Sequence, residues 1–193
     1  MLSFNHYRRE TLSLQIPTGW TEISPSHPRI TACFQVKESN QQTTKVLVTI
    51  SHLNYTQREF GQKFIKGLLT TQIAEEKDHM VETDVCLHEL TGTGTGFGYY
   101  FMATDRNWKK PQTLDVKIDF WGVMGGSAPQ IDSDSDSDSD WPYLVRCCYL
   151  VDHNNITEHT MIEMTILCYD QSSETIQQAF DFLKVNWDTN PSN

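Results

Sequence analysis

Four glycines are the first feature of the sequence that could do chemistry, because closely spaced glycines occur in loops that hold phosphate groups. They are Gly92, Gly94, Gly96 and Gly98, in the stretch GTGTGFGYYFMATD. A dinucleotide-binding fingerprint needs the spacing G-x-G-x-x-G and a helix directly after it, whose N-terminus holds the pyrophosphate. Here the spacing is two throughout, and the residues that follow are aromatic and strand-like. The pattern favours a hairpin turn, or a bulged strand that another backbone or ring approaches closely.

Soft metal ligands come together in the sequence near residue 150. They are Cys147, Cys148, His153 and His159. Neighbouring residues on a strand point to opposite faces of a sheet, so the adjacent cysteines do not readily bind one ion. His153 lies in VDHNNITEH, whose Asp and Asn residues are typical of a solvated turn. We therefore expect no metal site at these residues.

The cysteines of the chain are Cys33, Cys86, Cys147, Cys148 and Cys168, and they form no C-x-x-C motif. An odd number with one adjacent pair does not indicate a disulfide framework and is typical of a reducing compartment. Each cysteine stands in an apolar, strand-like stretch. Because a free cysteine in such a place behaves as a small hydrophobic residue, we expect all of them to be buried.

An acidic repeat, IDSDSDSDSDW, carries Asp at positions 132, 134, 136, 138 and 140. A calcium loop of the EF-hand kind also needs a central glycine and a bidentate glutamate at its last position, and both are missing. Dense like charge repels itself and keeps a segment extended. We expect residues 131–140 to form a disordered acidic loop, and weak, nonspecific binding of divalent cations is the less favoured alternative.

Motifs for catalysis are missing from the sequence. The chain has no G-x-S-x-G nucleophile elbow, no H-E-x-x-H zinc helix and no set of kinase motifs. Its carboxylates are scattered, and no two of them are marked as facing each other. The sequence therefore predicts no catalytic residue, no cofactor and no bound metal, and it favours a protein that is not an enzyme.

Much of the chain alternates apolar and polar residues, which is the period of a β-strand. In ETLSLQI, the side chains of Leu12, Leu14 and Ile16 share one face. The segments ITACFQV (30–36) and KVLVTISHL (45–53) flank a polar turn, which predicts neighbouring antiparallel strands. Further strand-like segments follow at 83–90, 97–104, 113–125, 141–151 and 160–170.

Two segments have a helical period instead. In residues 56–78, Thr56 and Glu59 have the spacing of a capping box, and an apolar stripe follows them. The stripe consists of Phe60, Phe64, Leu68 and Ile73, flanked by Ile65 and Leu69. Residues 172–187 begin with a cap at Ser172 or Ser173 and then place one apolar stripe along a second helix, through Ile176, Phe180 and Leu183.

Strands that follow one another directly usually pair as antiparallel neighbours, so the order of elements predicts an α+β fold rather than a doubly wound parallel one. We expect residues 1–193 to form a single α+β domain. Its main feature is a mainly antiparallel sheet of about six to eight strands with two main helices packed on it. The tail, residues 188–193, is expected to be frayed.

The charge of the chain bears on its partners. Lys and Arg number 15 against 25 Asp and Glu, which gives a formal net charge of -10. Such a field repels phosphate backbones and anionic lipid heads, so we expect neither nucleic acid nor membrane as a partner. Apolar runs are too short for a spanning helix or a secretory signal. These features predict a cytoplasmic protein.

Three segments resemble one known group. The opening LSLQIPTGW, the strand GYYFMATD and the closing MTILCYDQSSETIQQAFDFLKV are similar to the corresponding parts of the PsbP-like, or DcrB-like, α/β sandwich. That group includes extrinsic subunits of photosystem II, a Ran-binding nuclear transport factor and bacterial relatives. The resemblance covers about two thirds of the chain in the same order of elements, and its motifs mark the fold rather than a reaction.

The resemblance implies a binding module and brings no catalytic residues. Members of the group dock on assemblies, on GTPases or, in a bacterial branch, on the transmembrane segments of type VI secretion effectors. This chain differs from the exported members because it has no signal or lipidation sequence and carries the Asp-Ser insertion. Those differences favour a cytosolic adaptor over a photosystem or envelope role.

The leading hypothesis is a non-enzymatic cytosolic protein that docks a protein partner through a face of its sheet. Large aromatic side chains often carry the energy of an interface, and the candidate anchors are Trp108, Trp121, Trp141 and Tyr99. One alternative is an adaptor, chaperone or immunity protein for a secreted type VI effector. Another is a small-ligand carrier or an enzyme whose pocket the sequence does not display.

Overall fold

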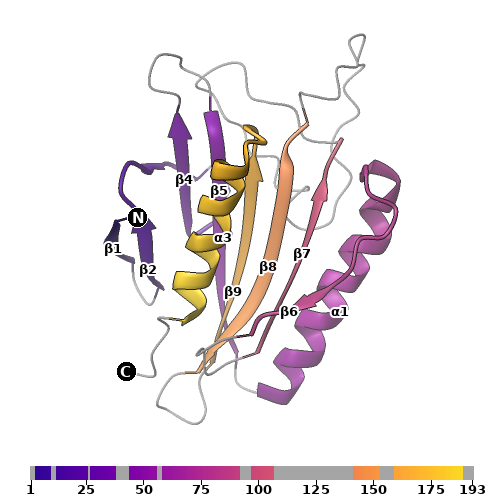
Figure 1. Cartoon of the computed structure of the whole chain (residues 1–193). Helices are drawn as coiled ribbons and strands as arrows, with labels where there is room; N and C mark the ends of the chain where they lie inside the picture. Colours follow the sequence, from indigo (N-terminus) through magenta and orange to yellow (C-terminus); the bar gives the residue numbers. More distant parts are fainter. Residues whose placement is uncertain are drawn as a thin grey trace.

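A computed structural model describes residues 3–9, 12–25, 27–37, 44–55, 58–91, 97–106, 141–152 and 159–188. Within these residues the chain forms strands and two α-helices in an α+β arrangement, as predicted (Figure 1). The strands are β1 (Phe4–Arg9), β2 (Leu12–Pro17), β3 (Thr21–Ile23), β4 (Ala32–Lys37), β5 (Thr44–Tyr55), β6 (His88–Glu89), β7 (Gly98–Thr104), β8 (Tyr143–Asp152) and β9 (His159–Cys168). The helices are α1 (Arg58–Glu76), with a short 3-10 turn at Lys77–His79, and α3 (Ser173–Asp188).

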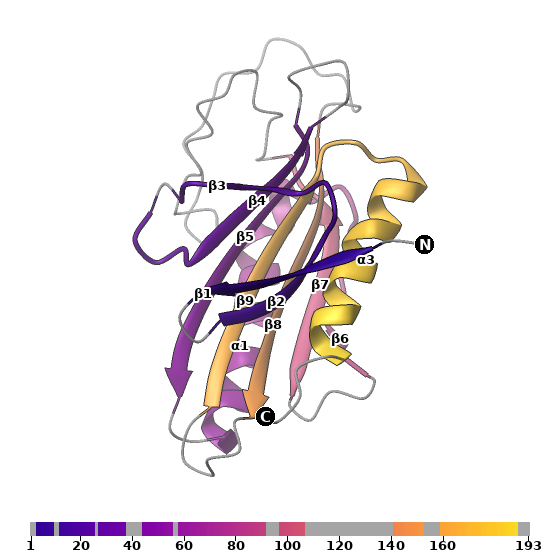
Figure 2. The same ribbon diagram turned by 90° about the vertical axis from the view of Figure 1, so that its left-hand side faces the viewer.

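The main sheet has seven strands in the order β3-β4-β5-β9-β8-β7-β6, and every neighbouring pair is antiparallel. The pairing of β4 with β5 confirms the neighbours predicted from the polar turn between them. Strands β1 and β2 form a separate hairpin. Figures 1 and 2 show α1 on one face of the main sheet, and α3 with the β1–β2 hairpin on the other. The fold therefore has two packed layers, one on each face.

On the face covered by α3, strand alternation produces the core that the sequence predicts. Leu12, Leu14 and Ile16 of β2 are buried there together with alternate residues of β4, β5, β8 and β9. Helix α3 contributes Phe182 and Leu183 to the same core. Its first turn is capped by Ser172, whose Oγ accepts the Thr175 N–H at 3.3 Å, as proposed for a cap at this position.

On the opposite face, α1 packs on β7 and β8, but along a different stripe from the one predicted. Ile65 and Leu69 are fully buried, whereas Phe64 is 41% exposed. The helix turns this way because Gly61 lies directly over β8, where a Cβ atom would come within 2.9 Å of Leu150 Cδ1. A glycine thus lets the Ile65 side of the helix approach the sheet. The predicted flank residues Ile65 and Leu69 therefore face the core, whereas the prediction is wrong for Phe64.

Two other predictions need correction. Residues 83–90 were expected to form a full strand, but only His88–Glu89 pairs, at the edge of the sheet. Strand β1 was not predicted, since its sequence FNHYRR has no regular apolar alternation. The predicted strand at 113–125, the acidic loop at 131–140, the proposed turn around His153 and the tail beyond residue 188 lie outside the described residues.

The cysteines are all free, and Cys33, Cys147, Cys148 and Cys168 are buried as expected. Cys86 is exposed and precedes β6, so the expectation of burial is wrong for it. The adjacent pair divides between the two layers, with Cys147 in the core under α3 and Cys148 in the core under α1. This confirms that the two thiols point to opposite faces.

Candidate functional site

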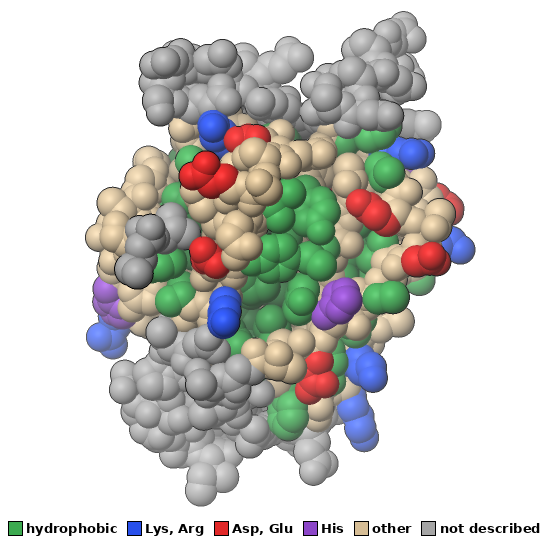
Figure 3. Space-filling view, in the orientation of Figure 1, with side chains coloured by type: hydrophobic (Ala, Val, Ile, Leu, Met, Phe, Trp, Pro, Cys, Tyr) green, Lys and Arg blue, Asp and Glu red, His purple; other side chains and the backbone are tan. Residues whose placement is uncertain are grey.

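Helix α3 leaves part of its sheet face uncovered. It packs on β2, β9 and β8, and the sheet continues past it through β7. There β7 presents Tyr100 and Met102, and β8 presents Tyr143, all three half-buried. Figure 3 shows hydrophobic side chains gathered beside α3, over β8 and β7. We call Tyr100, Met102, Tyr143, Ile176 and Phe180 the aromatic patch.

Helix α3 contributes two side chains to the aromatic patch. Ile176 and Phe180 are four residues apart, so they lie one above the other on the same flank of the helix. Both are half-buried against the core under α3. The Phe180 ring meets the Tyr100 ring edge to face, with centroids 6.3 Å apart and planes at 75°. This contact joins the helix to β7 across the patch.

The edge strand β6 borders the patch on its other side. His88 pairs in register with Tyr100, and the two rings stack with centroids 5.2 Å apart. Leu90, just beyond β6, packs against the same core. It lies close to Gly98, where a Cβ atom would meet Leu90 Cδ1 at 2.6 Å and Tyr149 Cβ at 2.7 Å. Tyr100 is therefore held between the histidine ring and the Phe180 ring.

Gly98 belongs to the glycine-rich stretch and has a structural role in the sheet. The described segment directly after these glycines is strand β7 and not a helix. Gly98 allows a side chain to approach the backbone closely, which is the structural role predicted for the glycines. Gly92, Gly94 and Gly96 lie outside the described residues.

A single anchored carboxylate lies near one end of the patch. The backbone N–H of Thr104 donates to Glu82 Oε2 at 2.7 Å, and the Thr104 hydroxyl donates to Glu82 Oε1 at 2.9 Å. Burial raises the pKa of Tyr143, and the Glu82 carboxylate raises it further. The phenol of Tyr143 therefore keeps its proton at neutral pH and can donate a hydrogen bond. The patch offers apolar rings, one thioether and phenolic hydroxyls, a set suited to contact with another surface.

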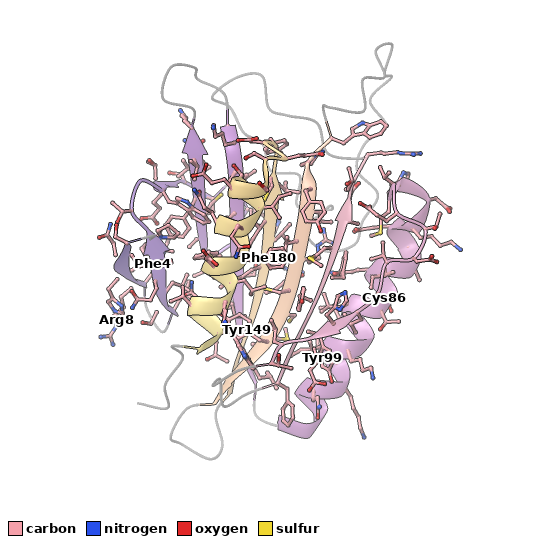
Figure 4. The ribbon with its side chains drawn as sticks, viewed as in Figure 1. Phe4, Arg8, Cys86, Tyr99, Tyr149 and Phe180 are labelled. Atoms are coloured by element: carbon pink, nitrogen blue, oxygen red, sulfur yellow. The ribbon has the colours of Figure 1, made fainter. Side chains whose placement is uncertain are left out.

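The structure describes two of the four predicted anchors, Tyr99 and Trp141. Tyr99 points to the α1 face, where Lys66 Nζ lies 6.0 Å from its ring centroid (Figure 4). Trp141 lies just before β8, with Arg106 Cζ 5.1 Å from its ring centroid. Neither residue belongs to the aromatic patch. Trp108 and Trp121 lie outside the described residues.

Sequence reasoning did not name Tyr100 or Phe180 as an anchor for a protein partner. The signal for Tyr100 was present, because alternation along β7 separates it from Tyr99 and aligns it with Met102. The signal for Phe180 was its place on the stripe of α3, which was read only as core. The contact between Tyr100 and Phe180 depends on where α3 lies across the strands, and the local sequence pattern does not show that position.

No protein-family model matches the chain, and no match was found among curated proteins. In the part of the chain that the structure describes, no helix is long and apolar enough to cross a membrane. Among the same residues, no three His, Cys, Asp or Glu side chains are grouped so that they could hold a metal ion.

Proposed function

We propose that this protein is a non-enzymatic binding module that docks a protein partner on the aromatic patch. The observation that supports this most is the cluster of half-buried rings between α3 and β6, on a sheet face that the helix does not fully cover. Exposed aromatic and methionine side chains are enriched in the centres of protein interfaces. The partner supplies apolar side chains that complete the burial of Tyr100, Met102 and Phe180.

The energy available fits a docking role. Complete burial of one large apolar side chain contributes about 1.5–3 kcal/mol, and the patch offers several that are half-buried. The rings are pre-positioned by the His88 stack and the Phe180 edge contact, so little side-chain freedom is lost on binding. Rigid aromatic anchors of this kind dominate the energy of many interfaces.

We propose a cytoplasmic location for the same module. Five free cysteines, four of them buried in strands, favour a reducing compartment. The resemblance to the PsbP-like group supports the same functional proposal, because members of that group act as docking modules. An adaptor for a secreted effector is one form that such a module takes.

Site-specific photo-crosslinking tests the proposal. A benzophenone amino acid replaces Met102 in the patch, and in a control variant it replaces Phe64, the exposed ring on α1 at the other face. After irradiation in cells at native expression level, the Met102 position should give a discrete protein adduct that the Phe64 position does not give. Identical adducts from both positions, or none from Met102, would reject the patch as a docking site.

Affinity for the captured partner then provides the quantitative test. Met102→Glu places a charge among the rings and should weaken binding of the purified partner at least tenfold, or about 1.4 kcal/mol. Phe64→Glu serves as the matched control and should leave the affinity unchanged. Circular dichroism of both variants checks that the fold is intact.

A further inference from the structure

The layer between α1 and the sheet contains charged side chains where apolar ones are expected. Arg146 lies in the middle of β8 and is fully buried. Its Nη1 donates to Glu76 Oε1 of α1 at 2.8 Å, and its Cζ lies 5.9 Å from the Phe101 ring centroid. Ion pairs are expensive to bury, and they persist only where further hydrogen bonds satisfy the remaining polar atoms. The residues around the Arg146–Glu76 ion pair therefore indicate its role.

Strand register brings more polar side chains to the same place. Thr165 of β9 is the pairing partner of Arg146, and Thr49 of β5 is the pairing partner of Thr165. Glu163 lies two residues from Thr165, so it shares the same face. Gln72 lies one turn before Glu76 on α1. We call Thr49, Gln72, Glu76, Arg146, Glu163 and Thr165 the buried polar cluster; it joins β5, β9, β8 and α1.

Several atoms of the buried polar cluster have no hydrogen-bond partner in the described part of the chain. They are Thr49 Oγ1, Gln72 Nε2, Gln72 Oε1, Glu76 Oε2, Glu163 Oε1 and Thr165 Oγ1. The side chains are deeply buried, with exposures of 4% for Thr49, 2% for Gln72 and 2% for Thr165. Buried polar atoms in proteins almost always have partners, so a group of unpartnered ones indicates a polar guest.

The chemistry of these atoms defines the guest. Three of them, Gln72 Oε1, Glu76 Oε2 and Glu163 Oε1, only accept hydrogen bonds when the carboxylates are ionised. The two threonine hydroxyls can donate or accept. Acceptors therefore outnumber donors, and a molecule with several N–H groups would match them. An anion is disfavoured by the two carboxylates, and a divalent metal ion by the neighbouring guanidinium.

Charge balance points in the same direction. Two carboxylates, Glu76 and Glu163, face one guanidinium, and Arg146 makes its 2.8 Å contact with Glu76. Burial raises the pKa of Glu163, while Arg146 and the Gln72 amide act to lower it. The Gln72 amide lies close enough to the Glu163 carboxyl to lower its pKa, but the two side chains do not form a hydrogen bond of normal geometry. Cys148, the pairing partner of Glu163, is a neutral buried thiol and adds no charge. Among its described residues, the ionised cluster therefore carries one negative charge more than it has positive charge.

We propose that the buried polar cluster binds a small primary ammonium ion, or the ammonium end of a small amine. Its three N–H groups donate to Glu163 Oε1, Gln72 Oε1 and a threonine hydroxyl, and its charge neutralises Glu163. The site lies on the opposite face of the sheet from the aromatic patch and does not depend on the docking function.

Calorimetric titration with methylammonium chloride tests this site. The wild-type chain should bind methylammonium saturably, and Glu89→Gln, a variant of an exposed glutamate on β6, should bind it equally well. Glu163→Gln keeps the shape of the side chain but removes its charge, and should weaken binding at least tenfold. Tetramethylammonium, which has the same charge but no N–H group, should give no saturable binding.

Three further measurements keep the test decisive. If Glu163→Gln does not fold, Thr165→Val serves instead and should weaken methylammonium binding several-fold. Titrations in buffers of different ionisation enthalpy should show that protons are released on binding, because the guest favours the ionised form of Glu163. Met102→Glu should bind methylammonium as the wild type does, which separates this site from the patch.

The proposal is overturned by any of three results. One is the lack of saturable binding of methylammonium to the wild-type chain. Another is equal affinity in the wild type and in Glu163→Gln. The third is equal affinity for tetramethylammonium, which would mean that only charge and not hydrogen bonding attracts the ion.

Discussion

Replacing Gly98 with alanine tests how closely β7 and β8 are packed beside the aromatic patch. Gly98 pairs in register with Tyr149, and an added Cβ atom would lie 2.7 Å from Tyr149 Cβ. Ordinary contact begins at 3.4 Å, so the two atoms would be 0.7 Å too close (3.4 minus 2.7). Tyr149 Cβ is bonded to the β8 backbone and does not rotate away. The strands themselves must therefore separate.

The expected cost follows from this geometry. Overpacking a well-filled site destabilises proteins by about 1–3 kcal/mol, and we expect Gly98→Ala to fall in that range. For a chain of this size, each kcal/mol lowers the melting temperature by about 2–4 °C. Separation of β7 from β8 would also strain the backbone hydrogen bond from Leu150 N–H to Phe97 O at 2.8 Å.

A second glycine provides the matched control. Gly67 is exposed on α1, and a Cβ atom there would meet nothing within 4 Å. Because alanine favours a helix over glycine, Gly67→Ala should stabilise the protein by about 1 kcal/mol. The same substitution is thus expected to have opposite signs at the two positions.

Urea unfolding followed by tryptophan fluorescence measures both effects, with the slope m used to check that the transition itself is unchanged. Adding Leu90→Ala to Gly98→Ala should recover little stability, because the Tyr149 clash remains. A Gly98→Ala protein that unfolds at the wild-type urea concentration or above it would show that β7 and β8 are not packed as described, and the account of the glycine would fail.

Two more predictions concern the polar cluster and the helix cap. Burial raises the pKa of Glu163 above its usual 4.5, so its contribution to stability is full below that pH and is lost as pH rises through the folded-state pKa. Glu163→Gln should therefore gain stability over wild type as pH rises from about 4 to 8, whereas Glu89→Gln should not; a pH-independent difference in urea midpoints would contradict this. Ser172→Ala removes the acceptor of the Thr175 N–H and should cost about 1 kcal/mol in the same assay, with Ser173→Ala as its neutral neighbour. Equal losses for the two serine variants would show that Ser172 is not the cap.

The alternation of apolar and polar residues predicted most of the strands, because alternation within a strand shows which side chains share a face. Leu12, Leu14 and Ile16 are buried together as their alternation requires. Direct strand succession explains every neighbouring pair of the main sheet except β5 and β9, which are far apart in the sequence. Strand β1 was not predicted because it lies at the surface, and only Phe4 and Tyr7 of its sequence FNHYRR are half-buried.

The phase of α1 could not be predicted from hydrophobicity alone. Phe64 is more apolar than its surroundings, yet the buried flank of the helix consists of Gly61, Ile65, Leu69, Gln72 and Glu76. Three of these five are not apolar side chains. They face the sheet because Gly61 makes room for Leu150 and because Glu76 reaches Arg146, and both partners lie far away in the sequence.

The aromatic patch depends on the same kind of distant information. Tyr99 and Tyr100 are equivalent in composition, and only the position of β7 in the sheet decides which of them faces α3. Local pattern separates the two faces but does not say which face stays uncovered. That depends on where α3 lies across the strands.

Strand β8 directs successive side chains into the two layers on either face of the sheet. Arg146 enters the buried polar cluster, Cys147 packs beneath α3, Cys148 returns to the α1 side, and Tyr149 meets Trp187 of α3 with ring centroids 5.7 Å apart. A displacement of this central segment toward either layer must move the side chains of the other by the same amount. The two surfaces of the protein therefore share a single mechanical support, and neither can be rebuilt without disturbing its counterpart.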